Sequence, residues 1–519
     1  MNNNLTKCFI NLILFQILLI LSPASAQFTF GTGLATTLTH GTFVSDTLGP
    51  VSTVSNLGIY GGWSAITLPA TGFFHTYYNG SIWFIVDPEG HPFITIGINS
   101  VETGGGRILP KDLKDIGANT VGKFSSYQPA SGITKTRAIN FMSNFIKIRS
   151  HLQTLYSQDI VPVFEPDFSS FCNGLTQGLI SQKDDPWLFG YFFDNELPFY
   201  KNQLSLSLAL STTDPQFKAA DAWMITQYGS GYLKSQITIT DEESYMGYVA
   251  ETYYRITTQA LKLYDPNHMA LGTRIHGGAK DNIPIIQAVG KFADIISINY
   301  YNDWEPRTDY MDMWLSQGNK PFFITEFYVK GDDTGLSNIE GAGWVVRSQS
   351  DRSLFYENWC LKLLSHPGSV GWHWFRYIDN NGSNKGLLDQ NYNWYEPLRT
   401  SFANISKDVY RLRSFMLYGN TNYNGWPINP TRILDVEHPS KLYPEVRASG
   451  RSIFVSNFSQ KPFQLVVYDL QGKQIQKWES SSTQKFQDFT INNSRSNGIY
   501  SYKLTEGNEV KRGGIILSD

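Results

Sequence analysis

The segment Gly190-Tyr-Phe-Phe-Asp-Asn-Glu196 joins a short apolar run to three polar residues, two of them acidic. Such a nearly continuous apolar run is typical of a parallel strand that is covered on both faces. A carboxylate at the end of this strand loses hydration, so Glu196 needs either a partner or a function there. The fold therefore depends on how many similar segments surround this one.

Seven more candidate strands, short and rich in Ile, Val and Phe, occur between positions 73 and 420. With the run at Phe189–Phe193 fourth in chain order, the others are Phe93–Ile98, Thr120–Phe124, Val161–Phe164, Ala270–Ile275, Ile295–Asn299, Phe322–Phe327 and Val370–Phe375. Segments of helical length separate them. The clearest is expected to begin at Thr240, with Glu243 completing a capping box, and to end at Tyr264 before Asp265-Pro266.

Alternating strands and helices over this length predict an α/β fold, a (β/α)8 TIM barrel spanning residues 73–420. An open doubly wound sheet is the structural rival. It predicts a glycine-rich phosphate-binding turn after the first strand, but Gly104-Gly105-Gly106 lacks the GxGxxG spacing. We therefore expect the barrel, and no nucleotide cofactor.

The remaining regions have simpler signatures. Lys7, an apolar run from Cys8 to Leu21 and the small residues Ala24-Ser-Ala26 predict a secretory signal peptide at 1–26, with an uncleaved membrane anchor as the alternative. Residues 27–72 are predicted to form an irregular or β-rich lead-in, and 421–432 a linker. Residues 433–519 alternate β-formers and turn signals, which predicts a small immunoglobulin-like β-sandwich.

Composition excludes some classes of function. The net charge of −3, with acidic and basic residues well mixed, gives no electrostatic footprint for nucleic acid. No later apolar stretch is long enough for a stable membrane span, and no Cys/His spacing indicates a metal. Whether Cys172 and Cys360 pair cannot be read from the sequence. The 13 Trp and 29 Tyr lean mildly toward carbohydrate, although core packing alone could account for them.

Polar residues follow the apolar strands at the positions where a barrel of this kind presents its active-site face. The predicted site residues are the carboxylates Glu196 and Glu326, accompanied by Asn99, Asn195, Arg274, His276, Tyr301, His373 and Trp374. Each glutamate alone could be a salt-bridge partner or a helix cap, and the two histidines could be barrel-mouth hydrogen-bonding groups.

Two glutamates on strands four and seven suit the hydrolysis of a glycosidic bond. One carboxylic acid protonates the leaving oxygen, and a second carboxylate about 5–5.5 Å away attacks the anomeric carbon with net retention. This chemistry needs no metal and no cofactor. The sequence therefore predicts a retaining β-glycosidase that uses Glu196 and Glu326.

Several ordered segments resemble the clan A glycoside hydrolases, and within them the β-agarase family, glycoside hydrolase family 50. The matching segments are Asp87-Pro-Glu-Gly-His-Pro-Phe-Ile-Thr-Ile-Gly-Ile-Asn-Ser100, Gly190–Leu197, Tyr264–His268, Ile324–Phe327 and His373–Tyr377. The resemblance implies Glu196 as acid/base and Glu326 as nucleophile, with Asn195, Tyr301 and Trp374 contacting sugar. It implies an agarose-like β-galactan as substrate, while a β-glucan or β-mannan, or catalytically silent glycan binding, remains an alternative.

The tail resembles the C-terminal sorting domain of type IX secretion cargo through Val467-Tyr-Asp-Leu-Gln-Gly-Lys473, Asn497-Gly-Ile-Tyr500 and Lys511-Arg-Gly-Gly-Ile-Ile-Leu517. That resemblance implies the type IX secretion machinery as a partner and a secreted or cell-surface location. An ordinary β-sandwich or a sugar-binding module is the alternative, because sandwich architecture does not fix function.

Overall fold

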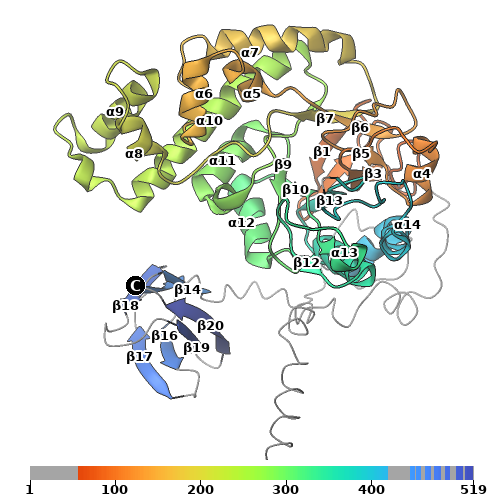
Figure 1. The fold of residues 1–519 in the computed structure, drawn as a ribbon. Coiled ribbons are helices and arrows are strands. Elements are labelled where there is room, and N and C mark those ends of the chain that lie inside the picture. The colour runs from red at the N-terminus through yellow and green to blue at the C-terminus, as the bar shows by residue number, and fades with distance from the viewer. Residues whose placement is uncertain are drawn as a thin grey trace, which may run out of the picture. The chain divides into compact units, whose positions relative to one another are not determined.

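A computed structural model describes residues 57–380 and 382–418, together with 445–449, 452–456, 462–468, 473–480, 486–490, 498–506 and 509–517 (Figure 1). The predicted signal peptide, most of the predicted lead-in and the predicted linker lie outside these residues. The chain divides into two compact units, Met1–Thr431 and Arg432–Asp519, and each is described by itself.

The first unit contains an eight-stranded parallel sheet in the order β8-β7-β6-β5-β4-β13-β10-β9. Its strands are β4 (Thr95–Ile98), β5 (Thr120–Val121), β6 (Thr134–Ala138), β7 (Leu188–Phe192), β8 (Met269–Ala270), β9 (Ile296–Asn299), β10 (Phe322–Glu326) and β13 (Ser369–Trp374). A parallel bridge between Ile275, after β8, and Ile298 in β9 joins the two ends. The sheet therefore curls into a TIM-like barrel with its strands in chain order, as predicted.

Helices follow most of the strands. They are α4 (Leu109–Asp115), α5 (Phe141–Ile146), α6 (Ser150–Ser157), α7 (Phe168–Thr176), α8 (Gln203–Leu208), α9 (Pro215–Tyr228), α10 (Ile239–Tyr264), α11 (Ile283–Phe292), α12 (Thr308–Gly318), α13 (Gln349–Leu364) and α14 (Glu396–Tyr418). Helix α10 packs against α11, α11 against α12, and α13 against α14. The capping box of α10 uses Thr238 and Asp241, two residues before the predicted pair.

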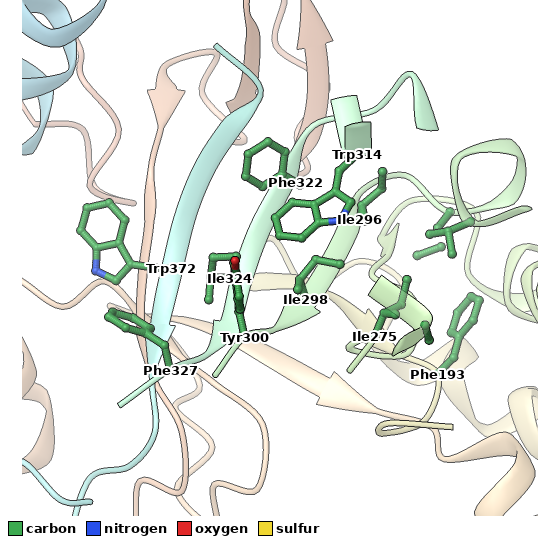
Figure 2. Close-up of a cluster of buried hydrophobic side chains, with 14 of the residues drawn as sticks. Phe193, Ile275, Ile296, Ile298, Tyr300, Trp314, Phe322, Ile324, Phe327 and Trp372 are labelled. Carbon is green, nitrogen blue, oxygen red and sulfur yellow. The ribbon is translucent and has the colours of Figure 1, made fainter. Parts of the chain in front are cut away.

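Aromatic side chains fill the layer between the barrel and its outer helices. Figure 2 shows Trp314 of α12 beside Phe322 of β10, and their ring centroids lie 5.2 Å apart in an edge-to-face arrangement. Tyr300 packs its ring 5.8 Å from that of Trp314. All three are fully buried, and burying such a side chain is worth roughly 1.5–3 kcal/mol. This layer fixes β9 and β10, the strands that lead into Tyr301 and Glu326.

A second apolar cluster lies inside the barrel toward the starts of the strands. It joins Phe189, Phe323 and Val370 to Phe74 and Ile85 of the N-terminal segment. That segment forms an antiparallel sheet of β1 (His75–Tyr78), β2 (Trp83–Val86) and β3 (Pro92–Phe93). The end of the barrel opposite the candidate site is thus filled by apolar side chains.

The predicted third strand is wrong. Val161–Phe164 forms no strand, and the third barrel strand is the polar segment Thr134–Ala138. Thr134 Oγ1 and Arg137 Nε are buried without a hydrogen-bond partner among the described residues, but two other polar groups are satisfied: Thr136 Oγ1 donates to the Val121 carbonyl at 3.1 Å, and Lys135 Nζ lies 2.6 Å from Asp185. Because these groups find partners inside the fold, the strand carries no apolar signature.

The second unit consists of two antiparallel sheets. One contains β14 (Glu445–Ser449), β15 (Ser452–Ser456) and β18 (Phe486–Thr490), and the other β16 (Phe463–Tyr468), β17 (Gln474–Ser480), β19 (Gly498–Glu506) and β20 (Glu509–Leu517). Ile453 of the first sheet shares a core with Leu465 and Leu504 of the second. This supports the predicted small β-sandwich, and its immunoglobulin-like topology stays a prediction.

No helix among the described residues is long and apolar enough to cross a membrane. Cys172 in α7 and Cys360 in α13 are both buried and unpaired.

Candidate active site

The end of β7 is held in place by Asp194, which is wholly buried. Its carboxylate accepts hydrogen bonds from the backbone N–H groups of Met142 and Ser143 at 2.7 and 3.0 Å, and from the Tyr253 hydroxyl at 2.5 Å. Asp194 is therefore a supporting acceptor. It anchors the turn on which Glu196 sits.

Glu196 is the more exposed of the two predicted catalytic carboxylates, with 33% of its side chain accessible. Its Oε1 accepts a 2.7 Å hydrogen bond from Asn299 Nδ2, at the end of β9. His276 Nδ1 lies 3.8 Å from the same oxygen. One side of Glu196 is thus fixed by the protein, while the group stays open to a ligand and to solvent.

Glu326, at the end of β10, has only 8% of its side chain exposed. Arg274 Nη2 lies 2.6 Å from Oε1, and the Tyr301 hydroxyl donates to Oε2 at 2.5 Å. Burial, reinforced by the Glu326 carboxylate, raises the pKa of the Tyr301 hydroxyl well above its usual value, so Tyr301 remains a donor. Both oxygens of Glu326 accordingly face fixed donors.

One hydrogen-bond network connects the two glutamates. Asn299 donates to Glu196 and accepts at 2.7 Å from the Thr325 hydroxyl, next to Glu326. Arg274 donates through Nη1 to Asn195 Oδ1 at 2.6 Å while its other nitrogen reaches Glu326. The ends of strands four, five, six and seven therefore meet around one point, as the sequence predicted.

The backbone at these strand ends adopts conformations that non-glycine residues rarely occupy. The φ angles are positive at Ser100 (55°), Phe124 (63°), Glu196 (51°), Arg274 (55°) and Asn302 (65°), each following a different barrel strand. Such strain costs of the order of 1–3 kcal/mol per residue and clusters at functional sites. Its concentration around Glu196 and Arg274 marks this face as the site.

The comparisons with known proteins agree with this geometry. No protein-family profile matches the chain. The solved structure of BpGH50 is 30% identical to it, covers 74% of this chain and 90% of its own, and superimposes with a TM-score of 0.65. This chain belongs to glycoside hydrolase family 50.

More distant family 50 and agarase relatives extend the match. Beta-agarase B of Vibrio sp. (strain JT0107) is 23% identical over 72% of this chain and 52% of its own length, so the chain spans about half of that relative. The structure of an exo-beta-agarase, 17% identical, covers 70% of this chain and 69% of its own with a TM-score of 0.58. This last likeness shows the shared fold alone.

Two predicted sugar contacts of this family 50 chain are misplaced. His373 lies wholly inside the barrel, where its Nε2 is 2.9 Å from the Thr95 hydroxyl, and burial lowers its pKa to about 3. Trp374 is fully buried behind the barrel, with its indole N–H donating to the Lys385 carbonyl at 3.0 Å. Because both side chains are fully buried, neither is placed to contact a sugar directly.

Asn99 occupies a supporting position. It is buried, and its Nδ2 donates to the carbonyl of Thr325 at 2.8 Å. Arg274 is also wholly buried, which makes it a positioning residue for Glu326. Asn195, His276 and Tyr301 are the predicted companions that remain partly exposed beside the two glutamates.

The structure adds residues that sequence reasoning missed. Phe375 is partly exposed and Phe124 is exposed. Their ring centroids lie 6.3 Å apart, next to Arg274. Lys123 is buried and donates to the Asp194 carbonyl at 2.9 Å, and burial together with Arg274 lowers its pKa to about 7. The position of Lys123 soon after β5 was the sequence signal for a site residue. It was overlooked because the preceding residue, Gly122, is not polar.

Among the described residues, no group of three or more His, Cys, Asp or Glu side chains is arranged to hold a metal ion.

Proposed function

We propose that this chain hydrolyses β-glycosidic bonds in an agarose-like β-galactan. The observation that carries the proposal is the convergence of Glu196 and Glu326 on one network at the C-terminal ends of β7 and β10. Membership of family 50 and the similarity to Vibrio beta-agarase B support the choice of substrate.

The surroundings of the two carboxylates favour different roles. Glu326 is nearly buried and held between an arginine and a tyrosine hydroxyl, which suits a fixed carboxylate that attacks the anomeric carbon. Glu196 is more exposed and has one hydrogen-bonded oxygen, which suits a group that gives a proton to the leaving oxygen and later takes one from water.

We further propose that the reaction proceeds by double displacement and retains the anomeric configuration. Retention requires carboxylates about 5–5.5 Å apart, whereas inversion needs about 6.5–9.5 Å, which leaves room for a water molecule. Proton NMR of the first product formed distinguishes the two outcomes. A β-configured reducing end released early supports retention, and an α-configured one overturns it.

The partly exposed companions supply contacts to the sugar next to the scissile bond. Asn195 Oδ1 accepts a hydrogen bond from Arg274, so the amide N–H groups of Asn195 remain as donors toward a sugar hydroxyl. His276 lies beside Glu196 and Tyr301 beside Glu326. Phe375 offers the aromatic ring that Trp374 was expected to provide, since apolar faces of sugar rings pack on aromatic rings.

A reducing-end assay on a panel of polysaccharides tests the function. Agarose, a β-1,4-glucan, a β-mannan and buffer alone are incubated with the full chain, and the products are sized. Release of oligosaccharides from agarose alone is the expected result. Release only from the glucan or mannan would overturn the substrate, and binding to agarose without any release would favour the silent glycan-binding alternative.

We also propose that the protein is exported through its N-terminal segment and that its C-terminal β-sandwich acts as a type IX sorting domain. The two antiparallel sheets of the second unit are compatible with such a domain. Expression in a bacterium with type IX secretion, with and without residues 433–519, tests this. Undiminished export of the truncated chain would contradict the sorting role.

A further inference from the structure

Beyond β13, the chain places a buried lysine with no partner close to the candidate site. Lys385 is only 6% exposed, yet its ammonium forms no hydrogen bond or ion pair with any residue that the structure describes. Its nearest aromatic partner is the ring of Tyr328, 5.8 Å away. The carboxylates of Glu340, Glu326 and Asp379 act on this ammonium without forming a direct ion pair with it, so its donors remain open to an anionic ligand.

A second cation, Arg376, also has no direct ion pair among the described residues, although Glu102 and Asp379 act on its charge. Arg376 donates its backbone N–H to the Lys385 carbonyl at 3.1 Å. Its Nε atom is buried and lacks a hydrogen-bond partner within the described part of the chain. Burial, together with the proximity of Arg376, contributes to lowering the pKa of Lys385, whereas the carboxylates of Glu340 and Glu326 oppose that shift. Two like charges are therefore held side by side.

The two cations are connected to Glu326 through a chain of aromatic side chains. Arg376 directly follows Phe375, whose ring centroid is 5.9 Å from that of Tyr328. The Tyr328 ring in turn lies 5.0 Å from the ring of Tyr301, which donates to Glu326. A ligand seated against Phe375 and Glu326 would thus meet Lys385 and Arg376 at its edge.

The Tyr328 hydroxyl belongs to the same cluster. A Cβ placed on Gly341 would come within 2.6 Å of this hydroxyl and 2.7 Å of Lys385 Nζ, so both polar atoms face one glycine. The loop that carries Gly341 is pinned by buried Lys330, whose Nζ donates to the carbonyls of Asn338 and Gly341 at 2.9 and 3.2 Å. The segment that packs against Lys385 is therefore held in place by hydrogen bonds.

We propose that Lys385, Arg376 and the Tyr328 hydroxyl bind a sulfate ester carried by the galactan substrate beside the bond that is cleaved. This inference rests on the proposed function and names its substrate class more closely. Three donors from separate segments match the terminal oxygens of a sulfate, and the two positive charges compensate its charge. A neutral galactan would leave both cations unpaired.

The test compares three agarose-type oligosaccharides of equal length: neutral, 6-O-sulfated on galactose, and oxidised to a carboxylate at C6. We expect kcat/KM of the full chain to be at least tenfold higher for the sulfated than for the neutral substrate. Preference for the carboxylated substrate alone would reassign the anion and contradict the sulfate proposal. Equal values for all three would overturn the anion site altogether.

Variants separate the cluster from general effects on folding. Lys385→Met and Arg376→Gln should each lower the sulfated-to-neutral ratio about tenfold, whereas Lys385→Arg should keep most of it. The exposed Lys111→Met serves as the matched control and should leave the ratio unchanged. Because the ratio is measured within one preparation, partial misfolding does not alter it. An unaltered ratio in Lys385→Met would contradict the proposal.

Calorimetric binding of the same oligosaccharides distinguishes this inference from the proposed function. If none of them is cleaved but the sulfated one binds tightest, hydrolysis of galactan is overturned while the anion site stands. If the neutral one is cleaved as well as the sulfated one and binds equally, only the anion site falls. If no oligosaccharide is bound or cleaved, both the anion site and the proposed hydrolysis of galactan are overturned.

Discussion

Arg274 and Glu326 form a 2.6 Å ion pair between the ends of the fifth and seventh barrel strands, and the arginine is wholly buried. The same guanidinium donates to Asn195, the neighbour of Glu196. Arg274 adopts a strained left-handed backbone conformation in reaching both. One residue thus positions Glu326 and the strand end that carries Glu196.

Replacing Arg274 by Met should destabilise the fold by about 3–5 kcal/mol, because it leaves a buried carboxylate without its counter-charge. Denaturant unfolding measures this loss. The exposed pair of Arg307 and Asp309 offers the control, since Arg307→Met should cost at most about 1 kcal/mol. Equal losses in the two variants would show that Arg274 contributes no more to the free energy of unfolding than an arginine in a surface ion pair.

Glu196→Gln should reduce kcat on agarose oligosaccharides by about 10²–10⁴, the usual contribution of a general acid. Aryl galactosides with good leaving groups need little protonation, so their first step should be affected much less. Stopped-flow release of the aryl group measures that step. An equally severe loss on both substrates would argue against the acid role of Glu196.

Lys123 should make stability depend on pH in a defined window. Burial lowers its pKa from 10.5 to about 7, so between these values the unfolded chain binds a proton that the folded chain does not. The free energy of unfolding should therefore gain up to about 1.4 kcal/mol per pH unit from this group as pH rises from about 7. Lys123→Met should lose that slope, and exposed Lys114→Met should keep it. Parallel pH profiles for wild type and Lys123→Met would rule the effect out.

Phe375 and Trp374 should respond to substitution in opposite ways. Phe375→Ala should raise KM for oligosaccharides several-fold with little change in thermal stability, because Phe375 is partly exposed beside Phe124. Trp374→Phe should lower stability by about 1–3 kcal/mol, because the smaller ring leaves a cavity and the Lys385 carbonyl loses one of its two donors. If Trp374→Phe impaired binding instead, the buried placement of this indole would be contradicted.

The barrel and its two glutamates could be predicted because their signals are local. Apolar strands such as Phe322–Glu326 end directly in the residue of interest, and strand order follows from the parallel architecture. The third strand could not, because Thr134–Ala138 is polar and Lys135 is paired with a residue distant in sequence, Asp185. A prediction based on apolar periodicity does not detect a polar strand of this kind.

Side-chain direction was the other limit. Within His373-Trp374-Phe375, one side chain points into the barrel, one points behind it and one stays accessible. A shift of one residue therefore moves a sugar contact to the wrong face. The cations Lys123, Arg376 and Lys385 were likewise missed, because their environment comes from segments that only the fold brings together.

The most direct test of the two-glutamate account is the rate at which Glu326→Gln releases reducing ends from agarose, with Glu340→Gln as the matched control. Glu340 lies exposed on the loop pinned by Lys330, so its variant should keep the wild-type rate. We expect Glu326→Gln to be less stable, because buried Arg274 loses its counter-charge, and its folded fraction to lose at least about a thousandfold in kcat, because an amide cannot attack the anomeric carbon. A Glu326→Gln variant as active as wild type would contradict the account.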